Sequence, residues 1–230
     1  MRTEGSTKPE CALCPFDWAD RACRHEGGKS PKNCPGKLHP DTVRDSIQEV
    51  QSPRILEFAA QASIQEAEGY GDRDKGYAFV RPIKPRIEEV MEFASRMRYR
   101  RLALIFCIGL RREAGVVHRI LAGRGFDVLS VACKVGGVPK EVLGLDESRK
   151  VAPGSYESMC NPILQAMIAN RYGSDFNVLL GLCVGHDSMF FRYAEAPTTV
   201  LAVKDRLLGH NPLAAVYQYE GYYRYLKKQP

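Results

Sequence analysis

Sulfur is the most distinctive chemical feature of this chain, because its eight cysteines form two sets of different spacing. Four lie close together near the start, and we call them the N-terminal quartet. The other four lie more than twenty residues apart, and we call them the edge quartet because the pattern of strands predicts them at one edge of a sheet. The N-terminal quartet is Cys11, Cys14, Cys23 and Cys34, and the edge quartet is Cys107, Cys133, Cys160 and Cys183.

The N-terminal quartet has the spacing of a metal site. Its first two cysteines are separated by two residues, Cys23 follows after eight more, and Cys34 after a further ten. A tight pair with two looser ligands closes a tetrahedral four-sulfur site, which suits zinc. Cys14 and Cys34 each precede a proline, as some iron–sulfur ligands do, so a cluster is a rival. We therefore predict a metal site that holds zinc or an iron–sulfur cluster.

Composition and charge limit the class of protein. The chain has 230 residues, of which 44% are hydrophobic and 26% charged, as expected for a globular domain with a small appendage. Its net charge of +6 is not gathered into a basic stripe with interleaved aromatics, which argues against a nucleic-acid partner. Because no apolar run could span a bilayer or serve as a signal core, we expect no membrane contact and a cytoplasmic location. Cysteines in that reducing compartment favour metal ligands or reactive thiols over disulfides.

The apolar pattern divides the chain into three regions. Residues 1–40 are rich in Gly, Pro, Lys and Cys and lack apolar periodicity, so we predict a cysteine-rich segment that a metal orders. Residues 41–100 contain two helical patterns, one from Pro53 to Gly69 and one across 85–100, and we expect this region to pack on a sheet. Residues 101–230 alternate apolar runs with helical patterns and form the predicted parallel α/β domain.

The apolar runs of the last region read as buried strands. They lie at 101–110, 126–137, 176–185 and 198–205, and helical patterns at 112–125, 161–173, 187–194 and from Pro212 separate or follow them. Near-continuous apolar strands between helices are typical of a parallel sheet covered on both faces. We predict an α/β fold with a small doubly wound, mainly parallel sheet of about four or more strands.

The predicted sheet brings the edge quartet together. Parallel strands end at the same edge of an open α/β sheet, where such folds bind ligands. Three members of the quartet come at the end of an apolar run, whereas Cys160 precedes Asn161 and Pro162, the expected cap and first residue of a helix. That helix leads into the third strand and therefore starts at the same edge. The positive end of its dipole would favour the thiolate form of Cys160.

Histidines and other polar residues are predicted at this edge as well. His186 follows the third strand by a few residues. His210 precedes Asn211 and Pro212, a second cap and first-turn pair, and faces the cysteines if both helices begin at one edge. A capping role for the histidines is the alternative to ligation. The other polar candidates are Lys134, Asp187, Lys204, Asp205 and Arg206.

The edge quartet suits two kinds of chemistry. It could hold a [4Fe–4S] cluster, and with three ligands one iron would stay open to polarise a small molecule. Alternatively, Cys160 or Cys183 is a thiol nucleophile. His186 or His210 is then its base, Asp187 is a further catalytic candidate, and the N-terminal zinc is structural. Single cysteines are often inert core residues, so it is the convergence of all four that favours a site.

The chain also resembles a known family. The runs "IFCIGLRREA", "VACKVG", "CNPILQA", "GLCVGHDSMFF" and "AVKDRLLGHNPLAA", after a cysteine-rich start, are similar to an uncharacterised bacterial and archaeal cysteine-rich family of unknown function. Its members are described as candidate metal-binding proteins. The resemblance runs from about Cys11 to the last helix and implies metal binding at all eight cysteines, without an established reaction. Enzymatic action on a small molecule and non-enzymatic metal binding or electron transfer with a redox partner both stay open.

Overall fold

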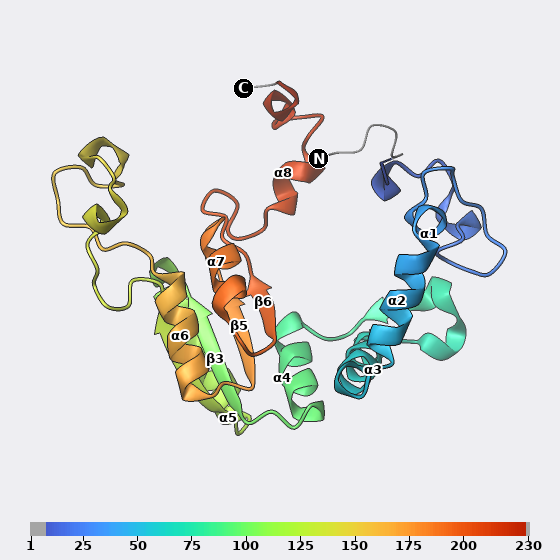
Figure 1. The fold of residues 1–230 in the computed structure, drawn as a ribbon, viewed down its shortest axis with the longest axis horizontal. Coiled ribbons are helices and arrows are strands. Elements are labelled where there is room, and N and C mark those ends of the chain that lie inside the picture. Colours follow the sequence, from blue (N-terminus) through green and yellow to red (C-terminus); the bar gives the residue numbers. More distant parts are fainter. Residues whose placement is uncertain (1–7, 229–230) are drawn as a thin grey trace. The chain divides into compact units, whose positions relative to one another are not determined.

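The computed structural model describes residues 8–228 and divides into two compact units (Figure 1). The first ends at Ser63 and the second begins at Ile64. Residues 1–7 of the predicted metal-binding segment 1–40 lie outside the described residues. Across residues 8–228, no helix is long and apolar enough to cross a membrane.

The first unit consists of short helices and irregular chain. It contains the 3-10 helices η1 (Cys11–Leu13) and η2 (Trp18–Asp20), followed by α1 (Pro35–Leu38), α2 (Pro40–Val50) and the start of α3 (Pro53–Glu68). All three α-helices have proline at the first turn, where its missing N–H costs nothing. No residue from 8 to 63 is buried, as expected from the absence of an apolar pattern in this part. Hydrophobic packing therefore contributes little to the order of this unit.

A short connection leads from the end of α3 to the sheet. The strands β1 (Tyr70–Gly71) and β2 (Arg81–Pro82) pair antiparallel around the 3-10 helices η3 (Arg73–Lys75) and η4 (Tyr77–Phe79). The helix α4 (Arg86–Arg96) then buries one apolar face, and the Phe93 ring lies 5.6 Å from that of Phe176 in the sheet. The helices predicted from Pro53 and across 85–100 are thus confirmed as α3 and α4.

The second unit is built on a four-stranded parallel sheet. Its strands are β3 (Arg101–Phe106), β4 (Asp127–Ala132), β5 (Phe176–Leu180) and β6 (Thr198–Ala202), in the order β4-β3-β5-β6. The central strands β3 and β5 are almost completely buried, which explains their continuous apolar sequence. The predicted α/β fold with a parallel sheet is confirmed.

Helices connect and cover the strands. They are α5 (Arg111–Gly123), α6 (Pro162–Tyr172), α7 (His186–Tyr193) and α8 (Leu213–Tyr217), with the 3-10 helices η5 (Ile108–Leu110), η6 (Lys140–Leu143), η7 (Glu147–Arg149) and η8 (Arg224–Lys227). In Figure 1, α6 and α7 lie over one face of the sheet. Ala103, Ile105 and Leu179 form one buried cluster with residues of these two helices. Because side chains alternate along a strand, Cys107 continues the face of Ala103 and Ile105.

Candidate functional site

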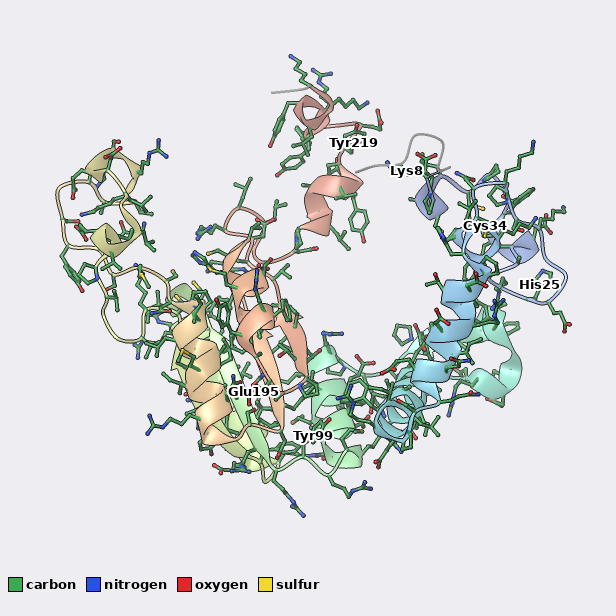
Figure 2. All side chains as sticks on the ribbon, viewed as in Figure 1. Lys8, His25, Cys34, Tyr99, Glu195 and Tyr219 are labelled. Atoms are coloured by element: carbon green, nitrogen blue, oxygen red, sulfur yellow. The ribbon has the colours of Figure 1, made fainter. Side chains whose placement is uncertain are left out.

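The N-terminal quartet lines one cavity in the first unit. The cavity has a volume of about 520 Å³, and all four cysteines contribute to its wall together with Arg21, Lys29 and Lys37. Cys11 and Cys23 are exposed, and the other two thiols are half-buried. The η1 turn brings the first pair together through a hydrogen bond from the Cys14 N–H to the Cys11 carbonyl. The sulfurs therefore share a basic, solvent-open hollow, in the region where Cys34 is labelled in Figure 2.

His25 does not join this cavity. Its two ring nitrogens lie 2.8 Å from the Ala19 carbonyl oxygen and 2.9 Å from the Glu26 carbonyl oxygen. Local backbone contacts thus occupy the imidazole that lies between the cysteines in sequence. Across the described range 8–228, no group of three or more His, Cys, Asp or Glu side chains is arranged to hold a metal ion.

The edge quartet lies where the sheet ends. Cys107 directly follows β3, Cys133 directly follows β4, and Cys183 comes shortly after β5. Cys107 and Cys133 are buried, with 7% and 2% of their surface exposed, whereas Cys160 and Cys183 are half-buried. Three of the four thus come from the carboxyl ends of adjacent parallel strands, as the apolar runs predicted.

Cys160 reaches this edge through a long excursion of the chain, residues 134–159. Its two sides are joined by backbone hydrogen bonds from Met159 to Val138 and from Lys140 to Glu157, at 2.7 and 2.9 Å. A third bond, 2.7 Å long, runs from the Asn161 N–H to the Cys133 carbonyl and closes the base of the excursion. These bonds place Cys160 Sγ 3.6 Å from Cys133 Sγ.

The cap predicted for the following helix is present. The Asn161 side-chain oxygen accepts a hydrogen bond from the Leu164 N–H at 2.9 Å, and Pro162 is the first residue of α6. Because the cap starts α6 immediately after the closed excursion, it also helps to hold Cys160 at the sheet edge.

Hydrogen bonds link three of the four thiols. The Ile108 N–H donates to Cys133 Sγ at 3.3 Å. The hydrogen bond to Cys133, together with burial, raises the pKa of Cys107 to about 12. For Cys133 the bond from Cys107 works in the opposite direction, but its own bond to Cys160 and its burial outweigh it and raise its pKa. Cys107 and Cys133 are therefore thiols at neutral pH.

Cys160 is the anionic end of this chain of thiols. A hydrogen bond from Cys133 and the nearby charge of Lys134 lower the pKa of Cys160 to about 7, although burial and the neighbouring sulfurs of Cys183 and Cys107 oppose the shift. About half of the Cys160 side chains are then thiolates at neutral pH. The sequence predicted a lowered pKa from the helix dipole, whereas the main physical cause of the shift is the hydrogen bond from the neighbouring thiol.

Basic side chains lie beside three different sulfurs. Lys134 acts on Cys160, and the Arg206 guanidinium donates to Cys183 Sγ at 2.9 Å. The Lys204 charge acts on Cys107, and its ammonium reaches over Gly109, where a Cβ atom would lie 3.2 Å from Nζ. The cations make this edge of the sheet favourable for negatively charged sulfur.

Two glycines give this region its shape. Gly181 has φ +69°, and a Cβ atom there would lie 2.2 Å from Leu110 Cδ1 and 3.9 Å from Lys204 Cδ. Gly109 leaves room for the Lys204 ammonium. The backbone after β3 and β5 therefore leaves the space through which the lysine approaches Cys107.

The predicted site residues His186, Asp187 and His210 each have different surroundings. Burial lowers the pKa of His186, against the charge of Asp187, so its imidazole is mostly neutral near pH 7. Asp187 accepts a hydrogen bond from the Ser188 N–H at 2.8 Å, within its own helix. His210 Nδ1 accepts a hydrogen bond from the Asp205 N–H at 3.1 Å, so this ring nitrogen is used in its own loop.

The helix expected after His210 is present, but it begins one residue later than predicted. Pro212 is the cap of α8 and Leu213 its first residue, and Asn211 makes no side-chain capping bond. His210 has φ +68° and its N–H donates to the Asp205 carbonyl at 2.9 Å, so the chain turns tightly just before the helix. His210 therefore lies in a local turn, whereas Cys160 directly precedes a side-chain helix cap, Asn161.

Gln165 is a buried polar residue beside the site that was not predicted from the sequence. It is completely buried on α6, and its Nε2 donates to the carbonyls of Phe106 and Val131, at the ends of β3 and β4. Within residues 8–228, its Oε1 has no hydrogen-bond partner. Its position beside Ala166 and Ala169 on the apolar face of a predicted helix could have indicated a buried, hydrogen-bonded amide.

Comparison with known proteins places the chain in a family. It belongs to the family described as "Protein of unknown function (DUF1847)", whose model matches residues 34–201. "Uncharacterized protein MJ0455" of Methanocaldococcus jannaschii is 40% identical over 176 residues, which cover 76% of this chain and 88% of that protein. No solved structure matches the chain. The family model includes the edge quartet and Cys34 but begins after the first three cysteines, later than the resemblance predicted.

Proposed function

We propose that this member of the DUF1847 family is a metal-binding protein with two sulfur sites, one in each cysteine quartet. The observation that carries the proposal is the 3.6 Å distance between Cys133 Sγ and Cys160 Sγ. Two thiolates on one tetrahedral ion, with metal–sulfur bonds of about 2.3 Å, lie about 3.8 Å apart. The pair therefore has nearly the separation that two ligands of a single ion require.

The surroundings support the same proposal. Cys107 is hydrogen-bonded to Cys133 and is the proposed third ligand, and Cys183 is the proposed fourth. The thiol protons that now link the sulfurs would leave as the metal binds. Lys134, Lys204 and Arg206 would then offset part of the negative charge of the bound thiolates.

The short sulfur–sulfur distance favours zinc over a cluster at the edge quartet. Each cysteine of a [4Fe–4S] cluster binds a different iron, so its sulfurs lie farther apart than two ligands of one ion. A cluster is the second candidate because the Ile108 N–H donates to Cys133 Sγ, and such bonds tune cluster potentials. It would need the Cys133–Cys160 pair to separate.

The N-terminal quartet is the proposed structural zinc site. Its four thiols line one cavity, and no residue from 8 to 63 is buried. A metal would supply the cross-links that a hydrophobic core supplies elsewhere. A cytoplasmic location fits both sites, because a reducing compartment keeps all eight cysteines free. The cations of the sheet edge suit an anionic small molecule or redox partner.

Metal analysis of the anaerobically purified full-length protein tests the proposal. Wild type is expected to hold two zinc equivalents and no acid-labile sulfide. Cys133→Ser and Cys160→Ser each lose one equivalent, and Cys11→Ser loses the other. The control Ser155→Ala, on the excursion that precedes Cys160, loses neither. An absorption spectrum with iron and sulfide would identify a cluster instead. Equal metal content in all five proteins would reject both sites.

A further inference from the structure

The edge quartet contains a pair of thiols with very different access to solvent. Cys133 is buried with 2% of its surface exposed, whereas Cys160 is half-buried. Their sulfurs are 3.6 Å apart, and the disulfide bond length is about 2.05 Å. A movement of about 1.5 Å, within reach of side-chain rotation, would join them.

The backbone holds these two cysteines together without any ligand. The Asn161 N–H donates to the Cys133 carbonyl at 2.7 Å, so the residue after Cys160 is tied to Cys133 itself. The Met159 N–H donates to the Val138 carbonyl, also at 2.7 Å, and secures the other side of the same connection. The closeness of the sulfurs is therefore a property of the fold.

We propose that Cys133 and Cys160, when free of metal, form a redox-active dithiol that reduces small anionic disulfides. Cys160 attacks and Cys133 resolves, because only Cys160 of the two has access to solvent. This activity goes beyond metal binding and does not depend on it. It uses the same two sulfurs, so a bound ion would block it.

The proposed reaction has two exchange steps. The Cys160 sulfur attacks one sulfur of glutathione disulfide, whose sulfur–sulfur bond breaks, and one glutathione leaves while the other is bonded to Cys160. The Cys133 sulfur then attacks Cys160 Sγ and releases the second glutathione. Two cysteine thiols are oxidised to one disulfide, and their two protons end on the two glutathione thiols. An added dithiol restores the starting state.

The other thiols of the quartet are less suited to these steps. Cys107 is 7% exposed, so a pair made of Cys107 and Cys133 offers no attacking sulfur to a substrate. Cys183 is held by the Arg206 guanidinium at 2.9 Å. Together with Lys134, beside Cys160, Arg206 makes the approach positively charged, which favours a disulfide that carries carboxylates.

The test uses the full-length protein, stripped of metal by a chelator and treated with glutathione disulfide. Among the four edge cysteines, peptide mass spectrometry is expected to find one new disulfide, between Cys133 and Cys160. Cys133→Ser stops at the Cys160–glutathione adduct, and Cys160→Ser forms neither product. The control Ser155→Ala, on the excursion that precedes Cys160, still forms the disulfide. Hydroxyethyl disulfide, which is uncharged, is expected to react several-fold more slowly at low salt.

Wild-type peptide mapping decides the proposal even if a variant fails to fold. It is overturned if both cysteines stay reduced or if the new disulfide joins Cys107 to Cys133. Metal binding followed by no disulfide after stripping would keep the metal sites and reject the dithiol. Disulfide formation in a protein that never binds metal would keep the dithiol and reject the metal sites.

Discussion

The two cysteine quartets are held in place by different means. The N-terminal quartet lies in a unit where no residue from 8 to 63 is buried, so few packing contacts fix its sulfurs. The edge quartet follows strands whose residues, such as Leu104 and Leu179, are almost completely buried. The same residue type therefore plays two roles. In the first unit the proposed metal would supply the order, whereas at the sheet edge the core creates order for the sulfurs.

The largest expected effect is on folding: metal removal should unfold the first unit and leave the second unit folded. Structural zinc contributes about 10–16 kcal/mol of apparent binding energy in small zinc peptides, so the first unit should unfold in a chelator. Trp18 is the only tryptophan of the chain and lies in that unit, so its fluorescence reports on that unit. Hydrogen exchange should meanwhile show β3 still protected. Protection of residues 8–50 from hydrogen exchange in the metal-free protein would show that the first unit does not need a metal to fold.

Adding one methyl group at Gly181 should damage only the second unit. Gly181→Ala places a Cβ atom 2.2 Å from Leu110 Cδ1 on a backbone with φ +69°, so strain and overpacking add. We expect a loss of about 3 kcal/mol in the free energy of unfolding, measured by urea and circular dichroism. Gly123→Ala, where nothing lies within 4 Å of the new atom, is the control and should cost nothing. Equal effects of both changes would exclude the close contact.

The two asparagines that precede prolines should differ in importance. Asn161→Ala removes the side-chain cap of α6 and should lower the free energy of unfolding by about 1 kcal/mol. Asn211→Ala removes no capping bond and should be neutral. Urea unfolding measures both. A similar loss in both variants would mean that Asn211 caps its helix after all.

The smallest expected effect is on the reactivity of Cys160. Its pKa of about 7 depends on Cys133 first and on the charge of Lys134 second. Lys134→Met removes that charge and should raise the pKa, so less thiolate is present at pH 7 and alkylation of metal-free protein slows several-fold. Lys75→Met, whose lysine pairs with Asp72 in the connection before α4, is the control. The pH profile of iodoacetamide labelling, with peptide mapping, measures the shift. If the midpoint pH of labelling is the same in Lys134→Met as in wild type, Lys134 does not lower the pKa of Cys160.

The location of three edge cysteines could be predicted because it depends on local patterns. Continuous apolar runs indicate buried parallel strands, and such strands end at a common edge. Cys107, Cys133 and Cys183 therefore followed from the sequence alone. The cap at Asn161 could be predicted for a similar reason, since its hydrogen bond spans only three residues.

The details of the site could not be predicted because they depend on contacts between distant residues. His210 seemed to repeat the position of Cys160, but a hydrogen bond with Asp205 occupies its Nδ1. Gln165 joins the ends of two strands through carbonyls that are 34 and 59 residues away. Short sequence motifs contain no information about such partners.

The sequence by itself determined the α/β class, the parallel strands and the division of the cysteines into two quartets. These depend on residue order over a few turns or strands. Only the tertiary structure decided that Cys160 lies 3.6 Å from Cys133 and that its thiolate is stabilised by that neighbour. The reason is physical: backbone hydrogen bonds close the excursion over 134–159, and their effect on two sulfurs appears only when the chain is folded.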